Sequence, residues 1–294
     1  MADTYIDIHP HIISQDDRQY ARSPLFGVQS DWSRDRPVSV DGLIAAMDQA
    51  GVSKAAVVQA STCYGYDNTY LADSVAKYPG RLTAVGSVDV MQPDAPRQIR
   101  DWIARGITGL RLFTGGSTAA FDPSLLDDPR SFPAWELCGE AGLSMCVQTD
   151  PAGLAQVAGL AKRFPKVRIV LDHLGRPDVT DGPPYKHASS LFGLAPFENV
   201  YLKLTPRIFA DSKRGQATPE TLFPRLVEVF GSQRMAWGSN FPATEGPLAA
   251  ILKNAQESMT CLAGEDREWI FRRTAQTLYP QTGNPGLGDG SGGA

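Results

Sequence analysis

The sequence predicts an α/β fold of one domain, a (β/α)8 TIM barrel, and three observations support this. The chain has 294 residues, a usual length for one such barrel. Eight short, β-branched apolar segments alternate with longer segments of helical spacing. Several of the short segments, such as KAAVVQA and VRIVLD, are almost continuously apolar, which is typical of parallel strands covered on both faces.

The predicted strands lie along the whole chain, at Tyr5–His9, Lys54–Gln59, Leu82–Val88, Thr108–Phe113, Leu143–Gln148, Val167–His173, Val200–Leu204 and Met235–Ser239. Helical spacing is found at Val40–Ala50, Asn68–Tyr78, Ala95–Arg105, Phe132–Ala141, Leu154–Phe164, Pro219–Phe230 and Pro247–Cys261, and is weakest over Lys186–Pro196. One unbroken series of strands and helices favours a closed barrel over an open sheet. No G-x-G-x-x-G loop opens the first crossover, as a nucleotide-binding open sheet would require.

The chain ends after one more predicted helix, Asp266–Leu278. The segment TGNPGLGDGSGGA that follows is rich in glycine and has little to bury. We therefore expect a barrel over residues 1–280 and a disordered tail over residues 281–294. Ser14–Pro37 and Thr114–Arg130 are longer than ordinary connections, which predicts loops that cover a site.

The composition excludes several classes of protein. The 28 basic and 32 acidic residues give a net charge of −4 without a basic block, so we expect no nucleic-acid partner. No apolar run reaches the length of a membrane helix, and the first residues lack the features of a secretory signal. The four cysteines are scattered, which indicates mostly buried thiols in a reducing compartment. We expect a cytoplasmic protein with a small-molecule partner, and leave a homo-oligomer open.

Residues capable of chemistry gather where the predicted strands end, the usual place of a barrel's active site. Three of the four histidines lie there, and alternation puts His9 and His11 on the same side of the chain, with His173 on the sixth strand. A single histidine at a strand end is more often structural, whereas three together indicate a site. Other strand ends deliver Arg111, Gln148, Asp172, Lys203, Arg207, Ser239 and Asn240.

Several segments resemble one family. DIHPH (7–11), LDHLGRP (171–177) and WGSNFP (237–242) are similar to motifs of the amidohydrolase superfamily. Within it they resemble the branch that includes 2-pyrone-4,6-dicarboxylate lactonase and sugar-lactone hydrolases. VQAS (58–61) and GYDN (65–68) also resemble the second-strand segment of the pyrone dicarboxylate enzyme. The resemblance covers about residues 5 to 280.

The resemblance implies a hydrolase that opens a lactone bearing a carboxylate or a sulfonate, of the kind found in aromatic catabolism. His9, His11 and His173 would surround the scissile carbonyl and polarise it. Some members of the family require a bound metal ion and others do not. The three histidines would therefore either hold one zinc or manganese ion or act without a metal. Gln148 occupies the place of a Lys or His ligand in metal-dependent members, and an amide is a poor zinc ligand.

Asn240 departs from the family, which has at this place the Asp that takes a proton from the attacking water. An amide is too weak a base to accept that proton. Three interpretations stay open: an engineered Asp→Asn change that inactivates the enzyme, a natural member whose base lies elsewhere, or a binding protein without turnover. The first is preferred here because the rest of the site is that of an intact enzyme.

Five further residues are expected to contact the substrate. A guanidinium matches the two oxygens of an acid group, and by resemblance Arg111 and Arg207 are two of the arginines that hold it; a rim salt bridge is the alternative for each. Ser61 and Tyr64 follow the second strand and could donate hydrogen bonds, or belong to the turn before the next helix. Gln148 completes this set. The segment Thr114–Thr118 replaces a basic segment of the pyrone dicarboxylate enzyme, so one anion clamp is missing.

A second reaction class shares the first- and sixth-strand histidines. Metal-dependent nonoxidative decarboxylases of aromatic acids have them too, but depend on a firmly bound metal and a stronger ligand on the fifth strand. The sequence therefore favours the lactone hydrolase, with the decarboxylase and the disabled binding protein as alternatives.

Overall fold

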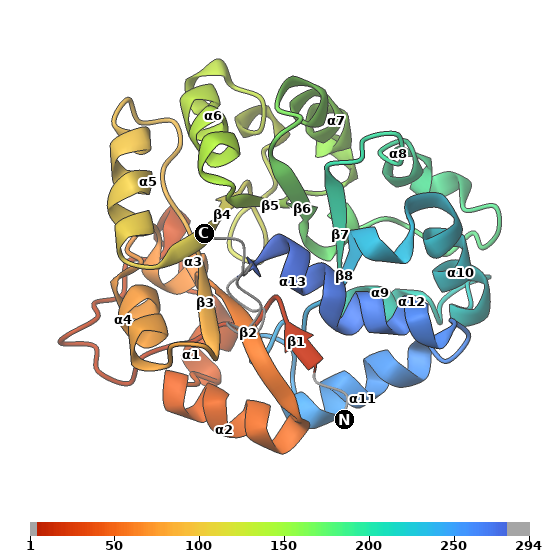
Figure 1. Ribbon diagram of the computed structural model, residues 1–294, viewed down its shortest axis with the longest axis horizontal. Coiled ribbons are helices and arrows are strands. Elements are labelled where there is room, and N and C mark those ends of the chain that lie inside the picture. Colours follow the sequence, from red (N-terminus) through yellow and green to blue (C-terminus); the bar gives the residue numbers. More distant parts are fainter. Residues whose placement is uncertain (1–4, 281–294) are drawn as a thin grey trace, which may run out of the picture.

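The fold is a (β/α)8 barrel, shown in Figure 1 as a computed structural model in which residues 5–280 are described. Eight parallel strands pair in the order of the sequence. Their bounds are β1 Tyr5–Asp7, β2 Val52–Val58, β3 Leu82–Gly86, β4 Ile107–Phe113, β5 Ser144–Gln148, β6 Arg168–Leu171, β7 Val200–Leu204 and β8 Met235–Trp237. The Ile8 amide donates to the Trp237 carbonyl at 3.2 Å, which joins the first strand to the last and closes the ring.

The helices surround the strands (Figure 1). They are α1 Asp31–Asp35, α2 Val40–Ala50, α3 Ser61–Tyr64, α4 Thr69–Lys77, α5 Ala95–Ala104, α6 Phe132–Ala141, α7 Leu154–Arg163, α8 Ser189–Phe192, α9 Pro206–Asp211, α10 Pro219–Phe230, α11 Leu248–Ser258, α12 Gly264–Glu268 and α13 Thr274–Leu278. Short 3-10 turns connect them, among them η1 Leu25–Gly27, η2 Pro123–Leu125, η3 Pro129–Ser131, η5 Asp172–Gly175 and η6 Lys186–Ala188, and Trp269–Arg273 is a π-helical turn. No helix within residues 5–280 is long and apolar enough to cross a membrane.

Local sequence determines where the helices begin and end, and α2 illustrates how. The Ser39 hydroxyl accepts from the Gly42 amide at 3.2 Å and caps the first turn. Gly51 ends the helix in the left-handed conformation (φ 71°), which a glycine adopts without strain. Val40, Leu43 and Met47 recur at helical spacing, and this face is buried against the barrel.

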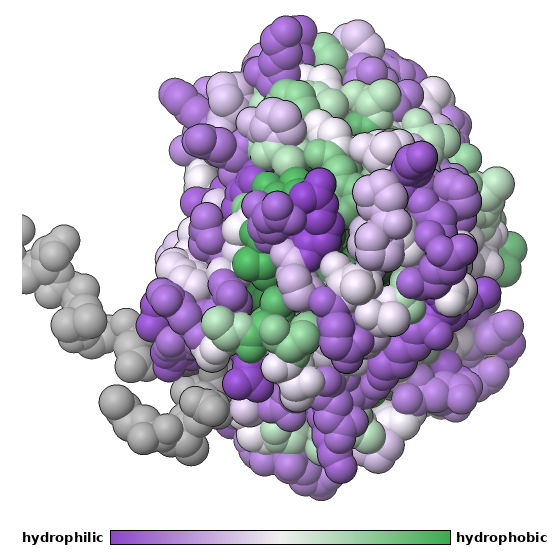
Figure 2. Space-filling view, turned by 90° about the vertical axis from the view of Figure 1, so that its right-hand side faces the viewer, coloured by the Kyte–Doolittle hydropathy of each residue, from purple (hydrophilic) through white to green (hydrophobic). Residues whose placement is uncertain are grey.

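The core has two parts, one between the strands and the helices and one inside the barrel. The inner part contains small and branched side chains from six strands, including Ile6, Val85 and Cys146. Residues of α13 and Tyr279 belong to it as well, and α13 lies across the centre of the ring in Figure 1. The Ser144 hydroxyl donates to the Leu278 carbonyl at 2.9 Å, which fixes this helix against the strands. Hydrophilic side chains predominate on the face in Figure 2, with apolar side chains in a recess between them.

The sequence predictions of the eight strands and seven helices are confirmed, with differences at their ends. The strands β1, β6 and β8 are shorter than predicted, so His9, His173 and Ser239 lie in the turns that follow them. Lys186–Pro196 contains only a 3-10 turn and the four-residue α8, and Asp266–Leu278 is interrupted by a π-helical turn. The cysteines are free thiols, buried except for Cys261. The predicted tail, residues 281–294, lies outside the described residues.

Candidate active site

A cavity of about 380 Å³ lies at the carboxyl ends of the strands, where the sequence predicts the site. Seven of the nine predicted site residues line it: His11, Ser61, Arg111, Gln148, His173, Arg207 and Asn240. The two long loops contribute Trp32 and Ser117 to its wall, as expected of covering loops, although both loops also contain short helical turns. A second cavity of about 550 Å³ lies beside Tyr5, Arg267 and Phe271, and no histidine lines it.

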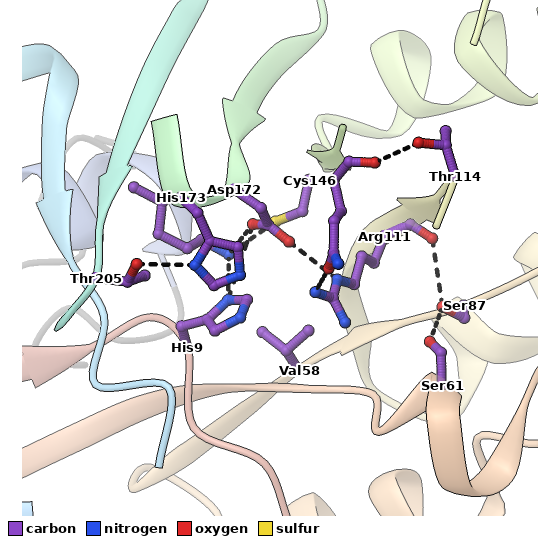
Figure 3. A network of polar contacts seen from close by, with 12 residues as sticks. His9, Val58, Ser61, Ser87, Arg111, Thr114, Cys146, Asp172, His173 and Thr205 are labelled. Atoms are coloured by element: carbon purple, nitrogen blue, oxygen red, sulfur yellow. Dashed lines mark hydrogen bonds and ion pairs between the residues drawn. The ribbon is translucent and has the colours of Figure 1, made fainter. Parts of the chain in front are cut away.

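An ion-pair network in the barrel interior supports the floor of the cavity (Figure 3). Asp172 is fully buried at its centre. Its Oδ1 lies 2.7 Å from Lys203 Nζ, and its Oδ2 accepts from Arg111 Nε at 2.9 Å. Burial alone would raise the pKa of Asp172, but the two cations outweigh burial and lower that pKa below its usual range. The Arg111 guanidinium also donates to Gln148 Oε1, so both side chains are held in place at the cavity wall.

His9 lies beneath the cavity rather than in its wall. Its Nδ1 contacts Lys203 Nζ at 3.0 Å, and its Nε2 is buried without a hydrogen-bond partner among the described residues. Its backbone amide donates to Asp7 Oδ1 at 2.9 Å, and the same oxygen accepts from the Ser239 amide at 2.8 Å. Burial raises the pKa of Asp7 to about 6. Burial, followed by Lys203, lowers the pKa of His9 well below its usual value, so this imidazole is neutral.

His11 presents a proton acceptor to the cavity. Its Nδ1 lies 2.8 Å from the Val58 carbonyl, which can only accept, so the ring proton is on Nδ1 and Nε2 carries a lone pair. The ring packs against Trp32 with 5.2 Å between centroids. Burial, followed by the Arg111 charge, lowers the pKa of His11 to about 3, which keeps the ring neutral near pH 7.

His173 lies in η5, directly after β6. Its backbone is left-handed (φ 54°), which turns the chain so that the side chain lines the cavity while Asp172 stays inside the barrel. His173 Nδ1 and Thr205 Oγ1 are 2.8 Å apart, and this contact orients the ring. Burial lowers the pKa of His173 to about 3. The ring centroids of His11 and His173 lie 4.9 and 5.0 Å from that of His9, so the three imidazoles form one cluster.

Asn240 is held by its own loop. Its backbone is left-handed (φ 53°), a conformation in which asparagine is enriched among non-glycine residues. Its Nδ2 donates to Thr244 Oγ1 at 3.1 Å, and the Thr244 amide donates back to the Asn240 carbonyl at 2.7 Å. The amide nitrogen is thus engaged by the loop of the cavity wall.

Arginine side chains dominate the charge of the cavity. Arg111, Arg176 and Arg207 line it, and no acidic side chain of the described residues does. The guanidinium of Arg176 packs 4.6 Å from the centre of the Phe121 ring, and its Nε is buried without a hydrogen-bond partner in the described chain. Burial, followed by the charges of Arg207 and Arg111, lowers the pKa of Arg176, although a guanidinium stays charged. This wall can hold an anion.

Two of the predicted site residues differ from expectation in their position. Tyr64 does not line the cavity: its hydroxyl accepts from the Ser14 amide and from Arg22, both at 2.8 Å, so it fixes the covering loop instead. His9 lies one layer below the cavity. Ser61 lines the wall, and its hydroxyl pairs with Ser87 Oγ at 3.0 Å.

A metal ion at the three histidines, which the resemblance allows, does not fit the donors. Within residues 5–280 no group of three or more His, Cys, Asp or Glu side chains is arranged to hold one. An ammonium has no acceptor, so the Lys203 contact makes His9 Nδ1 the acceptor and places the ring proton on Nε2. Gln148 Oε1 is engaged by Arg111. We therefore derive no step through a metal.

The sequence places Lys203 and Asp172 at strand ends without indicating their role, and it does not single out Arg176 or Thr205 as site residues. Lys203 is fully buried in the apolar strand VYLKL. A lysine inside a predicted buried strand is a signal, since an unpaired charge there is costly. The sequence does not indicate a role for Arg176, because the motif LDHLGRP in which it lies was assigned to the site on the basis of His173 alone.

Comparisons with known proteins agree with the sequence motifs. A family model described as amidohydrolase matches residues 6–281. The chain is 27% identical to an L-fucono-1,5-lactonase of Burkholderia ambifaria, over 93% of this chain and 94% of that protein. It is 26% identical to a 2-pyrone-4,6-dicarboxylate hydrolase of Comamonas testosteroni, over 68% of this chain and 66% of that protein.

Solved structures share the fold. An amidohydrolase from Burkholderia multivorans, solved with bound zinc, superposes with a TM-score of 0.74 at 19% identity, covering 94% of this chain and 99% of that one. A 2,6-dihydroxybenzoate decarboxylase superposes with a TM-score of 0.67 at 16% identity, covering 95% of this chain and 99% of that one. The family model spans nearly the whole barrel, including the strand-end motifs. The chain belongs to the amidohydrolase family.

Proposed function

We propose that the protein hydrolyses a lactone that carries at least one carboxylate or sulfonate group. The observation that carries this proposal is the wall of the cavity, which three arginines but no acidic side chain of the described residues line, beside a cluster of neutral imidazoles. A cavity of about 380 Å³ accommodates a single small ring with its acid groups. The named activities of the two relatives, both lactone hydrolases, support the same reaction class.

The arginines would hold and orient the substrate. Arg111 is fixed by Asp172 and Gln148, so it presents its remaining donors in one geometry. Arg176 and Arg207 lie on the same wall. Arg207 Nε also lies 3.5 Å from Asp211 Oδ2, so a rim ion pair is present, and the remaining donors of both arginines would meet a second oxygen or a second acid group. Fixed donors hold the scissile carbonyl near the imidazoles, which lowers the entropic part of the barrier.

The proton chemistry is assigned to His11. Its Nε2 lone pair would take a proton from a water molecule while the water oxygen bonds to the lactone carbonyl carbon. The resulting oxyanion would accept hydrogen bonds from neighbouring donors. When the ring C–O bond breaks, the imidazolium returns the proton to the leaving oxygen, and the product is a hydroxy acid. Arg111 contributes to the low pKa of His11, and an anion bound at Arg111 offsets that charge and makes His11 a better base.

Asn240 would position the water rather than deprotonate it. Its Nδ2 is engaged by Thr244, so Oδ1 remains as an acceptor at the cavity. The fit of the amide to its loop supports the second of the three interpretations, a natural member whose base lies elsewhere. Decarboxylation with a firmly bound metal is less well supported, because the donors do not gather around a metal position.

The test is a proton-release assay on a panel of acidic lactones with the wild type, Asn240→Asp and His11→Gln. Turnover by the wild type and its loss in His11→Gln support the proposal. Activity that appears only in Asn240→Asp would make residue 240 the base and the present chain a disabled hydrolase. Folded proteins that are silent in every form overturn lactone hydrolysis, and assays of aromatic acids with CO2 detection then follow.

A further inference from the structure

Lys203 Nζ contacts three side chains whose types also occur as metal ligands. Its Nζ is 2.7 Å from Asp172 Oδ1, 3.0 Å from His9 Nδ1 and 3.4 Å from Cys146 Sγ. Zinc binds carboxylate, imidazole and cysteine sulfur ligands, and here a carboxylate, an imidazole and a thiol face the nitrogen of a single side chain. Lys203 itself is completely buried.

The stoichiometry of donors and acceptors matches an ammonium. An ammonium has three N–H donors and no acceptor, and Lys203 Nζ has these three acceptor groups around it. Asp172 also accepts from Arg111, so two cations share one carboxylate. A divalent ion added to this cluster would meet two positive charges and only one negative charge, which opposes its binding.

The contact with Lys203 also determines which nitrogen of His9 carries the proton. The tautomer of a histidine is set by the partner of its other nitrogen. Because Lys203 can only donate, Nδ1 of His9 is the acceptor and Nε2 is an N–H donor without a partner among residues 5–280. His11 has the opposite tautomer, imposed by the Val58 carbonyl.

We propose that Lys203 is a positioning residue whose internal ammonium occupies the space between His9, Asp172 and Cys146 that a metal ion would need, and that it fixes His9 as an Nε2–H donor. The role of that donor rests on the proposed function, in which His9 Nε2–H would donate to the carbonyl oxygen of the lactone while His11 Nε2 takes the proton of the water. In this arrangement Lys203 makes His9 a hydrogen-bond donor to the substrate, while the neighbouring His11 is a proton acceptor.

The tautomers can be measured directly, since the chain has only four histidines. We would label them with nitrogen-15, record long-range proton–nitrogen correlations on the wild type, and assign His9 by its loss in His9→Gln. The expected pattern is protonated Nε2 for His9 and protonated Nδ1 for His11, unchanged after addition of zinc. A His9 spectrum with protonated Nδ1, or loss of the Nε2 proton when zinc binds, overturns the proposal.

Variants give a second readout. Lys203→Met is expected to change which ring nitrogen of His9 carries the proton. It should also lower kcat about 10- to 100-fold with little change in KM, because the imidazole loses the partner that orients it. Lys253→Met, an exposed lysine on α11, is the matched control and should change neither. A folded Lys203→Met protein with the wild-type His9 pattern contradicts the proposal. The wild-type spectrum decides the tautomer even if that variant does not fold or if no lactone proves to be a substrate.

Discussion

Arg111 Nε lies 2.9 Å from Asp172 Oδ2, so a guanidinium of the cavity wall is anchored to a carboxylate inside the barrel. The same carboxylate contacts Lys203, which in turn contacts His9. The groups expected to bind the substrate and those expected to act on it therefore share one buried charge. Four predictions depend on this arrangement and on the side chains around it.

Asp172→Asn is expected to destabilise the protein by about 3–5 kcal/mol, because it leaves two buried cations without their counter-charge. The free energy of unfolding from urea titrations measures the effect. Asp178→Asn, an exposed carboxylate, is the control and should change stability little. If the free energy of unfolding falls no further in Asp172→Asn than in the control, the ion-pair network contributes nothing to stability.

Arg176→Met is expected to raise KM for an acidic lactone about 10- to 100-fold, with a smaller change in kcat. The reason is that the variant loses a charge-assisted hydrogen bond to the acid group of the substrate. The methionine preserves the apolar contact with Phe121. Steady-state kinetics of Arg225→Met, an exposed arginine on α10, provide the comparison. An unchanged KM in Arg176→Met would remove this residue from the substrate site.

Thr205→Val is expected to lower kcat about tenfold, because the valine has the shape of threonine but cannot bond to His173 Nδ1. Thr205→Ser restores the hydroxyl and should recover most of the rate. Equal rates in the valine and serine variants would show that the hydroxyl does not orient the imidazole.

Stability is expected to fall as the pH decreases below about 6.5. The pKa values of His9, His11 and His173 are lowered in the folded state, so the unfolded chain binds three more protons there. Asp7, whose pKa is raised to about 6, opposes this with one proton. The net slope near pH 5 is roughly 2–3 kcal/mol per pH unit.

Urea unfolding at about pH 7, 6 and 5 tests this slope. His11→Gln should reduce this slope by about one proton, because it removes one of the three imidazoles whose pKa is lowered on folding. A free energy of unfolding that stays flat over this range would mean that the imidazoles become protonated without cost in the folded protein.

The sequence predicted the barrel because the signals for its elements are local. Apolar runs such as VRIVLD identify buried strands, and Ser39 and Gly51 delimit α2. The strand ends also identified seven of the residues that line the cavity. Tyr64 was misplaced because its partners, Ser14 and Arg22, come from a loop whose path local pattern does not determine.

The role of Lys203 was equally hidden. It depends on contacts with Asp172 on the neighbouring turn and with His9, which is 194 residues distant in sequence. The periodicity of apolar residues in the sequence does not show which side chains contact each other across the barrel. Strand alternation alone gives the direction of a side chain, but not which of several inward-facing groups it meets.

The closure of the barrel has a consequence for biosynthesis. The seam between β1 and β8 and the packing of α13 against the inner core both use the last quarter of the chain. A ribosome that has made only the first seven strands holds an open sheet with an unsealed apolar interior and a free edge at β1. The native barrel thus becomes available only after β8 and α13 have been made, and until then the nascent chain presents a surface to which chaperones can bind.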